Sequence, residues 1–354
     1  MTPRSIRAVA AAAALLLAGT TLAGCGDDGA DTGSSGAATA LRLGFFPNIT
    51  HAPALVGVQQ KLFEQSLGGT RLETKTFNAG PAAIEALFSG AIDATYIGPN
   101  PAINGWAQSK GEALRIIAGT TSGGAGLVVR STINGPADLK GKKIATPQLG
   151  NTQDVALRYW LKENGLTADQ QGGGDVSVLP QDNATAIQAF SSGAIDGAWL
   201  PEPHLSRLLL EQKGKLLVDE KTLWPGGQFV TTHLIVRTEF LRKYPETVKA
   251  LLQGHLKALD QIASDPAGAQ KAANEQIAAL TGKPLNDQIL AAAFQNMTFT
   301  ADPVAASLAA SAQHAEEIGL LKPVDLKGIY DLGPLNELLK SAGKPEVSPG
   351  GLAP

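Results

Sequence analysis

The chain has 354 residues, of which 44% are hydrophobic and 17% charged, with a formal net charge of -3 and a single cysteine. This length and apolar content suit one large domain or two lobes. The charge pattern disfavours a nucleic-acid partner, because the densest basic stretch is Lys140, Lys142 and Lys143, which we expect on a solvated turn.

Residues 1–24 are predicted to be a secretory signal peptide. Arg4 and Arg7 precede an alanine-dominated apolar run, which is too short and too weakly apolar for a membrane span. The run closes in Leu-Ala-Gly before Cys25, and this tetrapeptide resembles the bacterial lipobox, whose cysteine is acylated. A lone thiol in a secreted chain calls for a role, and lipidation of Cys25 supplies one.

The two ends of the mature chain are predicted to be loose. Residues 25–40 are polar and rich in glycine, and we interpret them as a lipidated tether that holds the folded part above a membrane surface. Residues 344–354 are rich in proline and glycine, and they are predicted to form a loose tail.

The first folded segment alternates strands and helices. Strands are predicted at residues 41–46, 71–77, 94–97 and 115–119, with helices from residue 53 toward 62 and around residues 84–87. Such alternating units predict a mostly parallel sheet covered by helices.

The same order then begins again. Strands are predicted at 143–146, 176–179 and 198–200, with helices from 151 to 161 and from 186 to 190. Residues 83–94 and 186–197 nearly repeat each other, and in both a helix ends at Ser-Gly before an Ala-Ile-Asp turn. Two copies are too few for a solenoid, so the repeat indicates two lobes.

The remaining chain is predicted to be helical. Apolar faces indicate helices at residues 248–262, 269–280, 286–294 and 304–318. The similar strands at 125–130 and 232–237 are interpreted as the two connections between the lobes, which the chain crosses near Gly126 and Leu234. Lobe one is therefore predicted to comprise residues 41–125 and 238–343, and lobe two residues 126–237.

Ligands of open α/β sheets bind beyond the carboxyl ends of the strands, where helices begin. Polar loops follow the predicted strands of both lobes, and we expect them to face one cleft. The candidate ligand-binding residues in these loops are Asn48, Thr50, His51, Gly98, Asn100, Ser122, Gly123, Gly150, Asn151, Thr152 and Glu202.

Four of these candidates leave alternatives open. Asn151 and Thr152 begin a helix and either cradle an oxyanion or cap that helix. His51 either hydrogen-bonds a ligand or is an ordinary residue at the start of a helix. Glu202 opposes an anion, so it either points aside to a structural partner or meets an amine of the ligand.

Several stretches resemble a known family, the solute-binding proteins of bacterial ABC importers for sulfonates, nitrate and thiamine-precursor-like ligands. The resemblance covers nearly the whole mature chain and is carried by GFFPN from Gly44 with Ala52-Pro53, FSGAID from Phe88, ADLKGKKIA from Ala137, Gly150-Asn151-Thr152 and AWLPEP from Ala198. It implies a type II periplasmic-binding fold, an α/β fold of two doubly wound lobes joined by two hinge strands, with C-terminal helices.

The resemblance also implies a site. In the aliphatic-sulfonate binders, the loops that match residues 48–51, 98–101, 122–123 and 150–152 surround the sulfonate. The chain departs from that pattern at Pro201-Glu202-Pro203, which looks more like the branches that bind nitrate or heterocycles. ADLKGKKIA is typical of the superfamily and silent about the ligand.

We therefore hypothesise a monomeric lipoprotein, anchored to the outer face of the cytoplasmic membrane, that closes on a small oxyanion, most simply an organosulfonate, and delivers it to an ABC permease with its ATPase. Nitrate, bicarbonate and a thiamine-precursor-like heterocycle are the alternative ligands. No cofactor, catalytic residue or metal is expected, since neither a Gly-x-Ser-x-Gly elbow nor a metal-binding histidine spacing occurs. The rivals are a secreted enzyme on this fold and an adhesive lipoprotein with an empty cleft.

Overall fold

The computed structural model describes residues 36–353. The predicted signal peptide, the predicted acylation site at Cys25 and nearly all of the predicted tether lie outside the described residues. The tether was predicted to extend to Ala40, but Ala38 is already buried, with 6% of its surface exposed. Its N–H donates to Thr247 Oγ1 at 2.8 Å and its carbonyl accepts from Thr70 Oγ1 at 2.6 Å. The folded part therefore begins before the first strand.

The first sheet, sheet A, has six strands in the order β11-β4-β10-β3-β1-β2. The strands β1, β2 and β3 run parallel, whereas β10 is antiparallel to both β3 and β4, and β11 is antiparallel to β4. Their bounds are β1 (Ala40–Phe45), β2 (Arg71–Thr76), β3 (Ala94–Ile97), β4 (Leu114–Gly123), β10 (Val230–Arg237) and β11 (Met297–Phe299).

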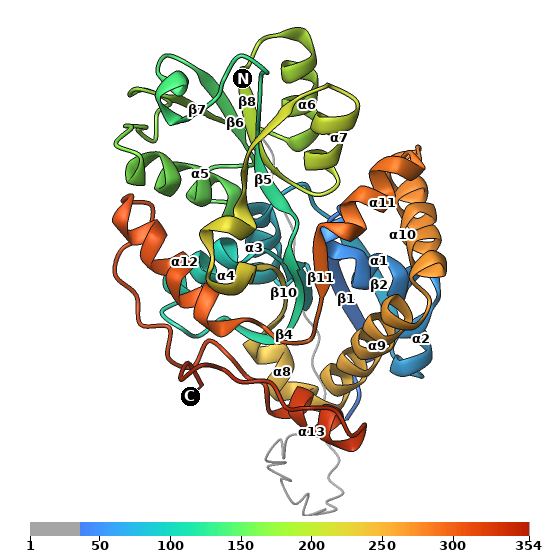
Figure 1. Ribbon diagram of the computed structural model, residues 1–354. Helices are drawn as coiled ribbons and strands as arrows, with labels where there is room; N and C mark the ends of the chain where they lie inside the picture. Colours follow the sequence, from blue (N-terminus) through green and yellow to red (C-terminus); the bar gives the residue numbers. More distant parts are fainter. Residues whose placement is uncertain (1–35, 354) are drawn as a thin grey trace, which may run out of the picture. The chain divides into compact units, whose positions relative to one another are not determined.

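The second sheet, sheet B, has five strands in the order β7-β6-β8-β5-β9 and lies at the top of Figure 1. Here β6, β7 and β8 run parallel, and β5 is antiparallel to β8 and β9. Their bounds are β5 (Ala125–Val129), β6 (Lys143–Thr146), β7 (Ser177–Pro180), β8 (Gly197–Pro201) and β9 (Lys215–Asp219).

The two sheets share one plan. In each sheet three neighbouring strands run parallel, and the strand that comes first in the sequence lies between the other two. The remaining strands lie on one side of this parallel trio and make antiparallel pairs. The prediction of mostly parallel sheets was therefore wrong outside the trios, because the strands next to the crossings between the sheets pair antiparallel. We use lobe one for sheet A with its helices and lobe two for sheet B with its helices.

The repeated Ser-Gly-Ala-Ile-Asp stretch makes the same connection in both lobes. Gly90 and Gly193 adopt φ of 70° and 83°, the left-handed conformation expected after a helix end. The aspartate that follows then pairs with the central strand. Asp93 N–H donates to the carbonyl of Arg42 at 2.8 Å, and Asp196 N–H donates to the carbonyl of Lys143 at 2.8 Å.

The chain crosses between the lobes twice. The first crossing is at Gly124, between β4 and β5, and the second lies between β9 and β10. The first lies close to the predicted Gly126. The return was predicted near Leu234, but Leu234 already pairs with Tyr96 and Ala118 in the middle of sheet A. The second crossing carries two short 3-10 helices, η3 (Glu220–Leu223) and η4 (Pro225–Gly227).

Helices cover both sheets. Lobe one has η1 (Ile49–His51), α1 (Ala52–Gln59), α2 (Leu62–Leu67), α3 (Gly80–Phe88) and α4 (Pro99–Gln108). Lobe two has η2 (Pro136–Leu139), α5 (Thr152–Glu163), α6 (Asn183–Ser192) and α7 (His204–Leu210). Buried apolar side chains form one core under sheet A and two smaller cores on the faces of sheet B.

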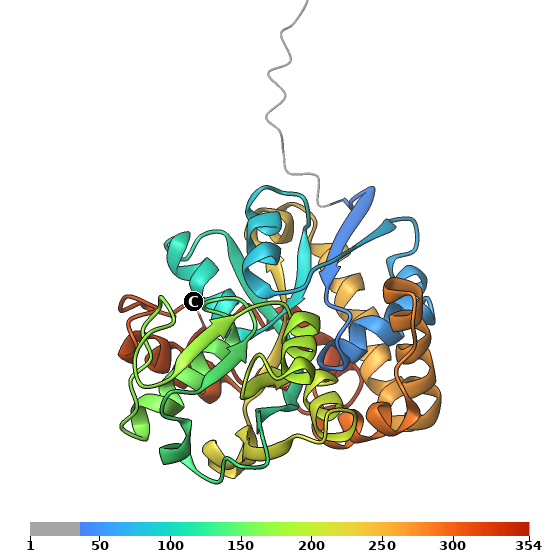
Figure 2. The ribbon, with the colours of Figure 1, turned by 90° about the horizontal axis from the view of Figure 1, so that it is seen from above.

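The C-terminal third returns to lobe one. It comprises α8 (Thr238–Lys243), α9 (Pro245–Ser264), α10 (Pro266–Thr281), α11 (Asp287–Gln295), α12 (Ala305–Glu317) and α13 (Gly333–Ser341). The helices α9 and α10 pack on α1, and Figure 2 shows these orange helices beside the blue N-terminal elements. The four predicted helices of this region correspond to α9, α10, α11 and α12.

Residues 344–353 are not the loose tail that we predicted. The side chain of Asn336 exchanges two hydrogen bonds with the backbone of Val347, at 3.0 and 2.9 Å. The carbonyl of Leu352 accepts from Gly328 N–H at 2.9 Å, and both Val347 and Leu352 pack against the core of lobe one. Apolar residues among the prolines and glycines thus hold this segment in place.

Candidate functional site

The loops at the carboxyl ends of the parallel strands meet around a small enclosed space, here called the inner pocket. Its volume is about 20 Å³, enough for a single water molecule. Both lobes contribute to its lining, which consists of Phe46, Asn48, Thr50, His51, Asn78, Gly98, Asn151, Thr152, Gln153, Asn183, Pro201 and Thr231.

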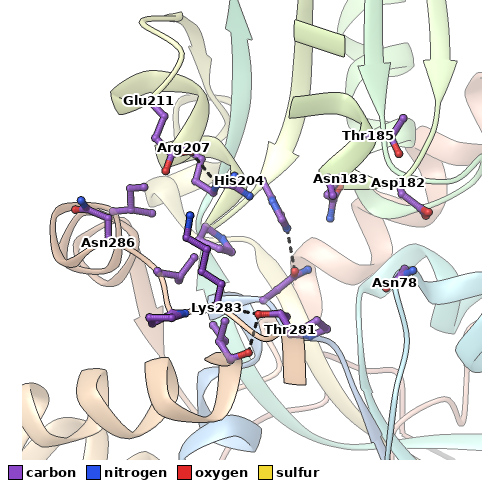
Figure 3. Close-up of a pocket in the computed structure, with 18 of the residues that line it drawn as sticks. Asn78, Asp182, Asn183, Thr185, His204, Arg207, Glu211, Thr281, Lys283 and Asn286 are labelled. Carbon is purple, nitrogen blue, oxygen red and sulfur yellow. Dashed lines mark hydrogen bonds and ion pairs between the residues drawn. The ribbon is translucent and has the colours of Figure 1, made fainter. Parts of the chain in front are cut away.

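A larger space, here called the outer chamber, adjoins the inner pocket and has a volume of about 720 Å³. Asn48, Asn78 and Asn183 line both spaces. In Figure 3, lobe two contributes His204 and Arg207, while lobe one contributes Thr281, the last residue of α10, and Lys283 from the loop that follows. The rest of the lining is Pro47, Phe77, Asp182, Ala184, Thr185, Pro203, Glu211, Ile277, Pro284, Leu285, Asn286 and Ile289.

Several helices begin at the inner pocket. Gly98 is the N-cap of α4, Asn151 is the N-cap of α5, and Asn183 is the first residue of α6. None of these three helices has a side-chain hydrogen bond at its N-cap. The alternative that the Asn151 side chain caps its own helix is therefore not observed. Uncapped N–H groups and the positive ends of helices favour an anion.

Two buried polar groups in the lining lack partners. Thr152 and Asn183 are 6% and 7% exposed, and neither Thr152 Oγ1 nor Asn183 Oδ1 has a hydrogen-bond partner among the described residues. A buried polar atom without a partner costs about 1–3 kcal/mol. The Thr152 hydroxyl can donate to an anion between the lobes, whereas Asn183 Oδ1 only accepts and would be satisfied by a donor of the ligand, such as an amine.

His51 presents a neutral donor to the inner pocket. The N–H of Phe46 donates to His51 Nδ1 at 3.3 Å, so the ring proton is on Nε2, and the two rings stack with centroids 4.5 Å apart. Burial lowers the pKa of His51 to about 3. The imidazole is therefore uncharged at neutral pH, and it offers one N–H.

His204 connects the two lobes at the border of the outer chamber. Its Nε2 lies 3.2 Å from Asn48 Oδ1, which is an acceptor, so Nε2 carries the proton. Burial, helped by the nearby charge of Arg207, lowers the pKa of His204 to about 3. Its Nδ1 is buried and has no partner in the described part of the chain. The closed arrangement of the loops thus includes a direct hydrogen bond between the lobes.

Charged side chains line only the outer chamber. The lining of the inner pocket, within residues 36–353, contains no acidic side chain, lysine or arginine. In the chamber Arg207 Nε pairs with Glu211 at 3.0 Å, while Asp182 and Lys283 come from opposite lobes. The inner pocket is therefore suited to an anion held by neutral donors, and the outer chamber to a larger group of mixed polarity.

The structure brings six of the eleven candidates together in the inner pocket. These are Asn48, Thr50, His51, Gly98, Asn151 and Thr152. Gly98 is also a point of close approach between the lobes, because a Cβ there would lie 2.4 Å from Thr152 Oγ1. Sequence reasoning missed the other half of the lining, which is Phe46, Asn78, Gln153, Asn183, Pro201 and Thr231.

Four other candidates lie outside both linings. Asn100 donates to the carbonyl of Ser311 at 3.1 Å, and Gly150 N–H donates to Asp154 at 3.0 Å. The Ser122 hydroxyl accepts from Phe229 N–H at 3.3 Å, and the carbonyl of Gly123 accepts from Thr231. The last two belong to β4, which was predicted to end at Gly119 but continues to Gly123.

Glu202, the eleventh candidate, also lies outside both linings and is completely buried. Both of its carboxylate oxygens accept hydrogen bonds from protein groups: Ser206 N–H, Ser206 Oγ and Asn296 Nδ2, at 3.1, 2.9 and 2.6 Å. Of the two alternatives, the structure shows the one in which Glu202 points aside to structural partners.

Two further features bear on the class of protein. Within residues 36–353, no helix combines the length and apolarity that crossing a membrane requires. In the same part of the chain, no group of three or more histidine, cysteine, aspartate and glutamate side chains is placed to hold a metal ion.

Two α/β lobes, two crossings and a polar pocket between the loops define a periplasmic-binding-protein fold. Comparisons with known proteins agree. The model of the NMT1-like family matches residues 35–279, and the chain belongs to this family. The fold is similar to that of the alkanesulfonate-binding protein SsuA from Xanthomonas axonopodis pv. citri bound to MOPS, with a TM-score of 0.67, 23% identity, and coverage of 81% of this chain and 96% of that one.

A second solved structure has a similar fold, the periplasmic nitrate-binding protein NrtA from Synechocystis, with a TM-score of 0.66, 16% identity, and coverage of 80% and 82%. In sequence, the chain is 29% identical over 217 residues to the taurine-binding periplasmic protein of Escherichia coli K12. That alignment covers 60% of this chain and 64% of the relative, slightly less than two thirds of its length.

Proposed function

We propose that the protein is an extracytoplasmic solute-binding protein of an ABC importer, which captures a small oxyanion-bearing solute, an organosulfonate, by closing its two lobes. The observation that carries the proposal is the inner pocket, where uncapped helix starts from both lobes meet the buried Thr152 hydroxyl, which has no partner among the described residues. Similarity to proteins named for taurine and alkanesulfonate binding supports the choice of ligand.

Neutral donors suit this role. A sulfonate stays ionised throughout the physiological pH range, and the N–H groups at helix starts, the Thr152 hydroxyl and His51 Nε2 can all donate to its oxygens. His51 stays neutral because its pKa lies at about 3. Reversible binding benefits from this arrangement, since no fixed cation holds the anion when the lobes open.

The two spaces would hold different parts of the ligand. The sulfonate head would occupy the inner pocket, and the organic part would extend into the outer chamber, whose apolar wall includes Phe77, Ile277 and Leu285. The inner pocket of about 20 Å³ holds only a water in this closed arrangement. Entry of the ligand therefore requires the lobes to separate, and the crossings at Gly124 and after β9 are the hinges of that motion.

The cellular setting is part of the same proposal. A signal peptide over residues 1–24 and acylation of Cys25 would place the protein on the outer face of the cytoplasmic membrane. The closed, loaded form would then meet an ABC permease and its ATPase. The folded part would act as a monomer of two lobes, in which the chain leaves lobe one at Gly124 and returns to it between β9 and β10.

Nitrate or bicarbonate is the second candidate ligand, and the similarity to the nitrate-binding fold favours it. Such an ion has no organic body, so it would use the inner pocket alone and leave the outer chamber to water. A thiamine-precursor-like heterocycle would do the reverse and fill the chamber. Catalysis on the same fold is the distant alternative, and turnover of a bound solute would reveal it.

Isothermal titration calorimetry of the mature protein tests the ligand. The panel is taurine, alkyl- and arylsulfonates, nitrate, bicarbonate and pyrimidines. We expect micromolar binding of sulfonates, an affinity of about -8 kcal/mol that is attainable for a small buried ligand. Heat from the neutral ligands alone would reject the oxyanion, and failure of the whole panel to bind or to raise the melting temperature would favour an adhesive role.

A substitution in the pocket makes the test specific. Thr152→Val removes the unpartnered hydroxyl and should weaken sulfonate binding about tenfold, the equivalent of about 1.4 kcal/mol. Thr132→Val is the matched control, because Thr132 is exposed on lobe two and lines neither space. Equal affinities for the two variants would show that the ligand does not contact the start of α5.

A further inference from the structure

Glu202 lies at the point where three segments of the chain meet. It follows β8 of lobe two, and its own N–H donates to the carbonyl of Gly124, the first crossing, at 2.8 Å. Its carboxylate accepts from Ser206 at the start of α7 and from Asn296, which lies between α11 and β11 of lobe one. The backbone of Glu202 is therefore bonded to the crossing, and its side chain joins the second lobe to the first.

The neighbours of Glu202 in the chain form the wall of the site. Pro201 lines the inner pocket, and Pro203 and His204 line the outer chamber. The turn from Pro201 to His204 is thus held against lobe one at two points. One is the bond between Glu202 and Asn296 at 2.6 Å, and the other is the contact between His204 and Asn48 at 3.2 Å.

We infer that Glu202 is a positioning residue: its carboxylate, held by Asn296 and Ser206, fixes the 201–204 turn against lobe one and so completes the second-lobe wall of the ligand site. It contacts no ligand itself, since it lines neither space and none of its surface is exposed. The inference extends the proposed function, because it concerns how the same site is assembled.

The chemistry of the group suits such a role. A buried carboxylate is costly unless donors surround it, and hydrogen bonds to an ionised group are short and strong. Burial raises the pKa of Glu202, while the bonds from Asn296 and Ser206 and the charge of Lys221 lower it. An apolar residue would satisfy packing alone, whereas this carboxylate requires three donors in fixed places.

Hydrogen exchange of the unliganded mature protein tests the inference without any ligand. In Asn296→Ala the donor from lobe one is lost, and we expect the amides of residues 202–207 to exchange about tenfold faster than in the unsubstituted protein. Gln295→Ala is the matched control, because Gln295 is the exposed preceding residue. Unchanged exchange in Asn296→Ala, or the same increase in both variants, would overturn the inference.

Reversing the hydrogen bond between Asn296 and Glu202 distinguishes a positioning role from a general loss of stability. Glu202→Gln alone places an amide donor against the Asn296 amide, and it should weaken binding of a sulfonate from the panel about tenfold. Combining it with Asn296→Asp turns the bond around, with the glutamine donating to the aspartate, and should restore the affinity to within about threefold.

These outcomes are distinct from failure of the proposed function. If the combined variant binds as weakly as Glu202→Gln alone, while both melt within a few degrees of the unsubstituted protein, the positioning role is wrong even though sulfonates bind. If no solute of the panel binds at all, the proposed function fails, and the exchange rates of residues 202–207 still decide the role of Glu202.

Discussion

The two lobes use the same aspartate in the same backbone arrangement. In lobe one the Asp93 carboxylate accepts from Arg42 N–H at 3.0 Å, and in lobe two the Asp196 carboxylate accepts from Lys143 N–H at 2.9 Å. The carbonyl of Asp93 accepts from the N–H of Arg237, the last residue of β10, at 2.8 Å, and the carbonyl of Asp196 accepts from the N–H of Arg130, which directly follows β5, at 2.9 Å. This arrangement ties the third strand of each trio to the first.

The charged partners of the two aspartates differ. Asp93 is 1% exposed and contacts two guanidinium groups, Arg42 at 2.6 Å and Arg237 at 3.3 Å. The hydrogen bond that Arg42 donates to the Asp93 carboxylate raises the pKa of Arg42. Asp196 is 32% exposed, and its one cationic neighbour among the described residues is the Lys142 amine at 3.8 Å.

The comparison distinguishes two contributions of the repeated aspartate, its hydrogen bonds with the backbone and its ion pairs. The backbone bonds are common to both lobes, so they are what the Ala-Ile-Asp turn requires. Among the described residues the arginine pairs occur only in lobe one, where Arg42 of β1 and Arg237 of β10 both reach the aspartate. The repeat thus specifies a local structure, and the packing around it determines how much the charge of the aspartate contributes.

The largest expected effect tests this comparison directly. Asp93→Ala removes the acceptor and leaves two partly buried guanidinium groups without it, which should lower the free energy of unfolding by about 3 kcal/mol. Asp196→Ala removes the same backbone acceptor next to solvent and should cost about 1 kcal/mol. Urea denaturation of both variants measures the difference. Equal losses would mean that the arginine pairs contribute nothing beyond the shared backbone bonds.

Glu220 extends the comparison to a buried carboxylate without an ion pair. It is 1% exposed in η3, and Trp199 Nε1–H donates to its Oε2 at 2.7 Å. Burial raises the pKa of Glu220 from 4.5 to about 7, although hydrogen bonds from the tryptophans oppose the shift. Arginines stabilise the buried charge of Asp93, whereas at Glu220 the indole donors offset only part of the free-energy cost of burying a charged carboxylate.

The sign of the pH effect follows from the raised pKa. Between pH 4.5 and 7 the folded state binds more protons at Glu220 than the unfolded state, so the stability contributed by this group is full below pH 4.5 and decreases as the pH rises through 7. The loss amounts to about 3 kcal/mol at most.

Glu220→Gln should remove this dependence. Urea denaturation at pH 4.5, 6 and 7.5 measures the free energy of unfolding of each protein, with Glu211→Gln, at an exposed glutamate that directly follows α7, as the control. A difference between Glu220→Gln and the unsubstituted protein that does not change across this range would contradict the assigned titration.

Much of the fold was predictable because its signals are local. The duplicated segment ending in Asp93 and Asp196 indicated two lobes, and periodic apolar faces indicated α9 to α12. The antiparallel strands were not predictable in this way, since their partners lie far away in sequence: β10 pairs with β3 and β4 more than a hundred residues earlier. The ends of β4 and the position of the second crossing depend on those pairings.

The site was half predictable for a similar reason. The rule that ligands bind beyond the carboxyl ends of parallel strands selected Asn48, Gly98 and Thr152, which the structure brings together in the lining of the inner pocket. The same rule applied after β7 would also have found Asn183, which begins α6. Ser122 does not line the pocket because β4 continues to Gly123 and the Ser122 hydroxyl accepts from Phe229 N–H, and Asn100 does not because it donates to the carbonyl of Ser311 in α12.

The smallest expected effect concerns a contact between the lobes. Lys162 of α5 and Glu317 of α12 form an ion pair at 2.8 Å, with their side chains 46% and 33% exposed. Solvent and salt screen such a pair, so Lys162→Ala should change the melting temperature by less than about 1 °C and sulfonate affinity by less than about twofold.

The neighbouring contact should matter more for closure. Tyr159 of α5 stacks on His314 of α12 with ring centroids 3.7 Å apart, a contact that buries apolar area and that salt does not weaken. We therefore expect Tyr159→Ala to weaken sulfonate binding more than Lys162→Ala does, because lobe closure loses the stacked rings. If calorimetry in low and high salt instead shows the larger loss for Lys162→Ala, long-range attraction between the lobes, rather than packing at their edges, governs closure.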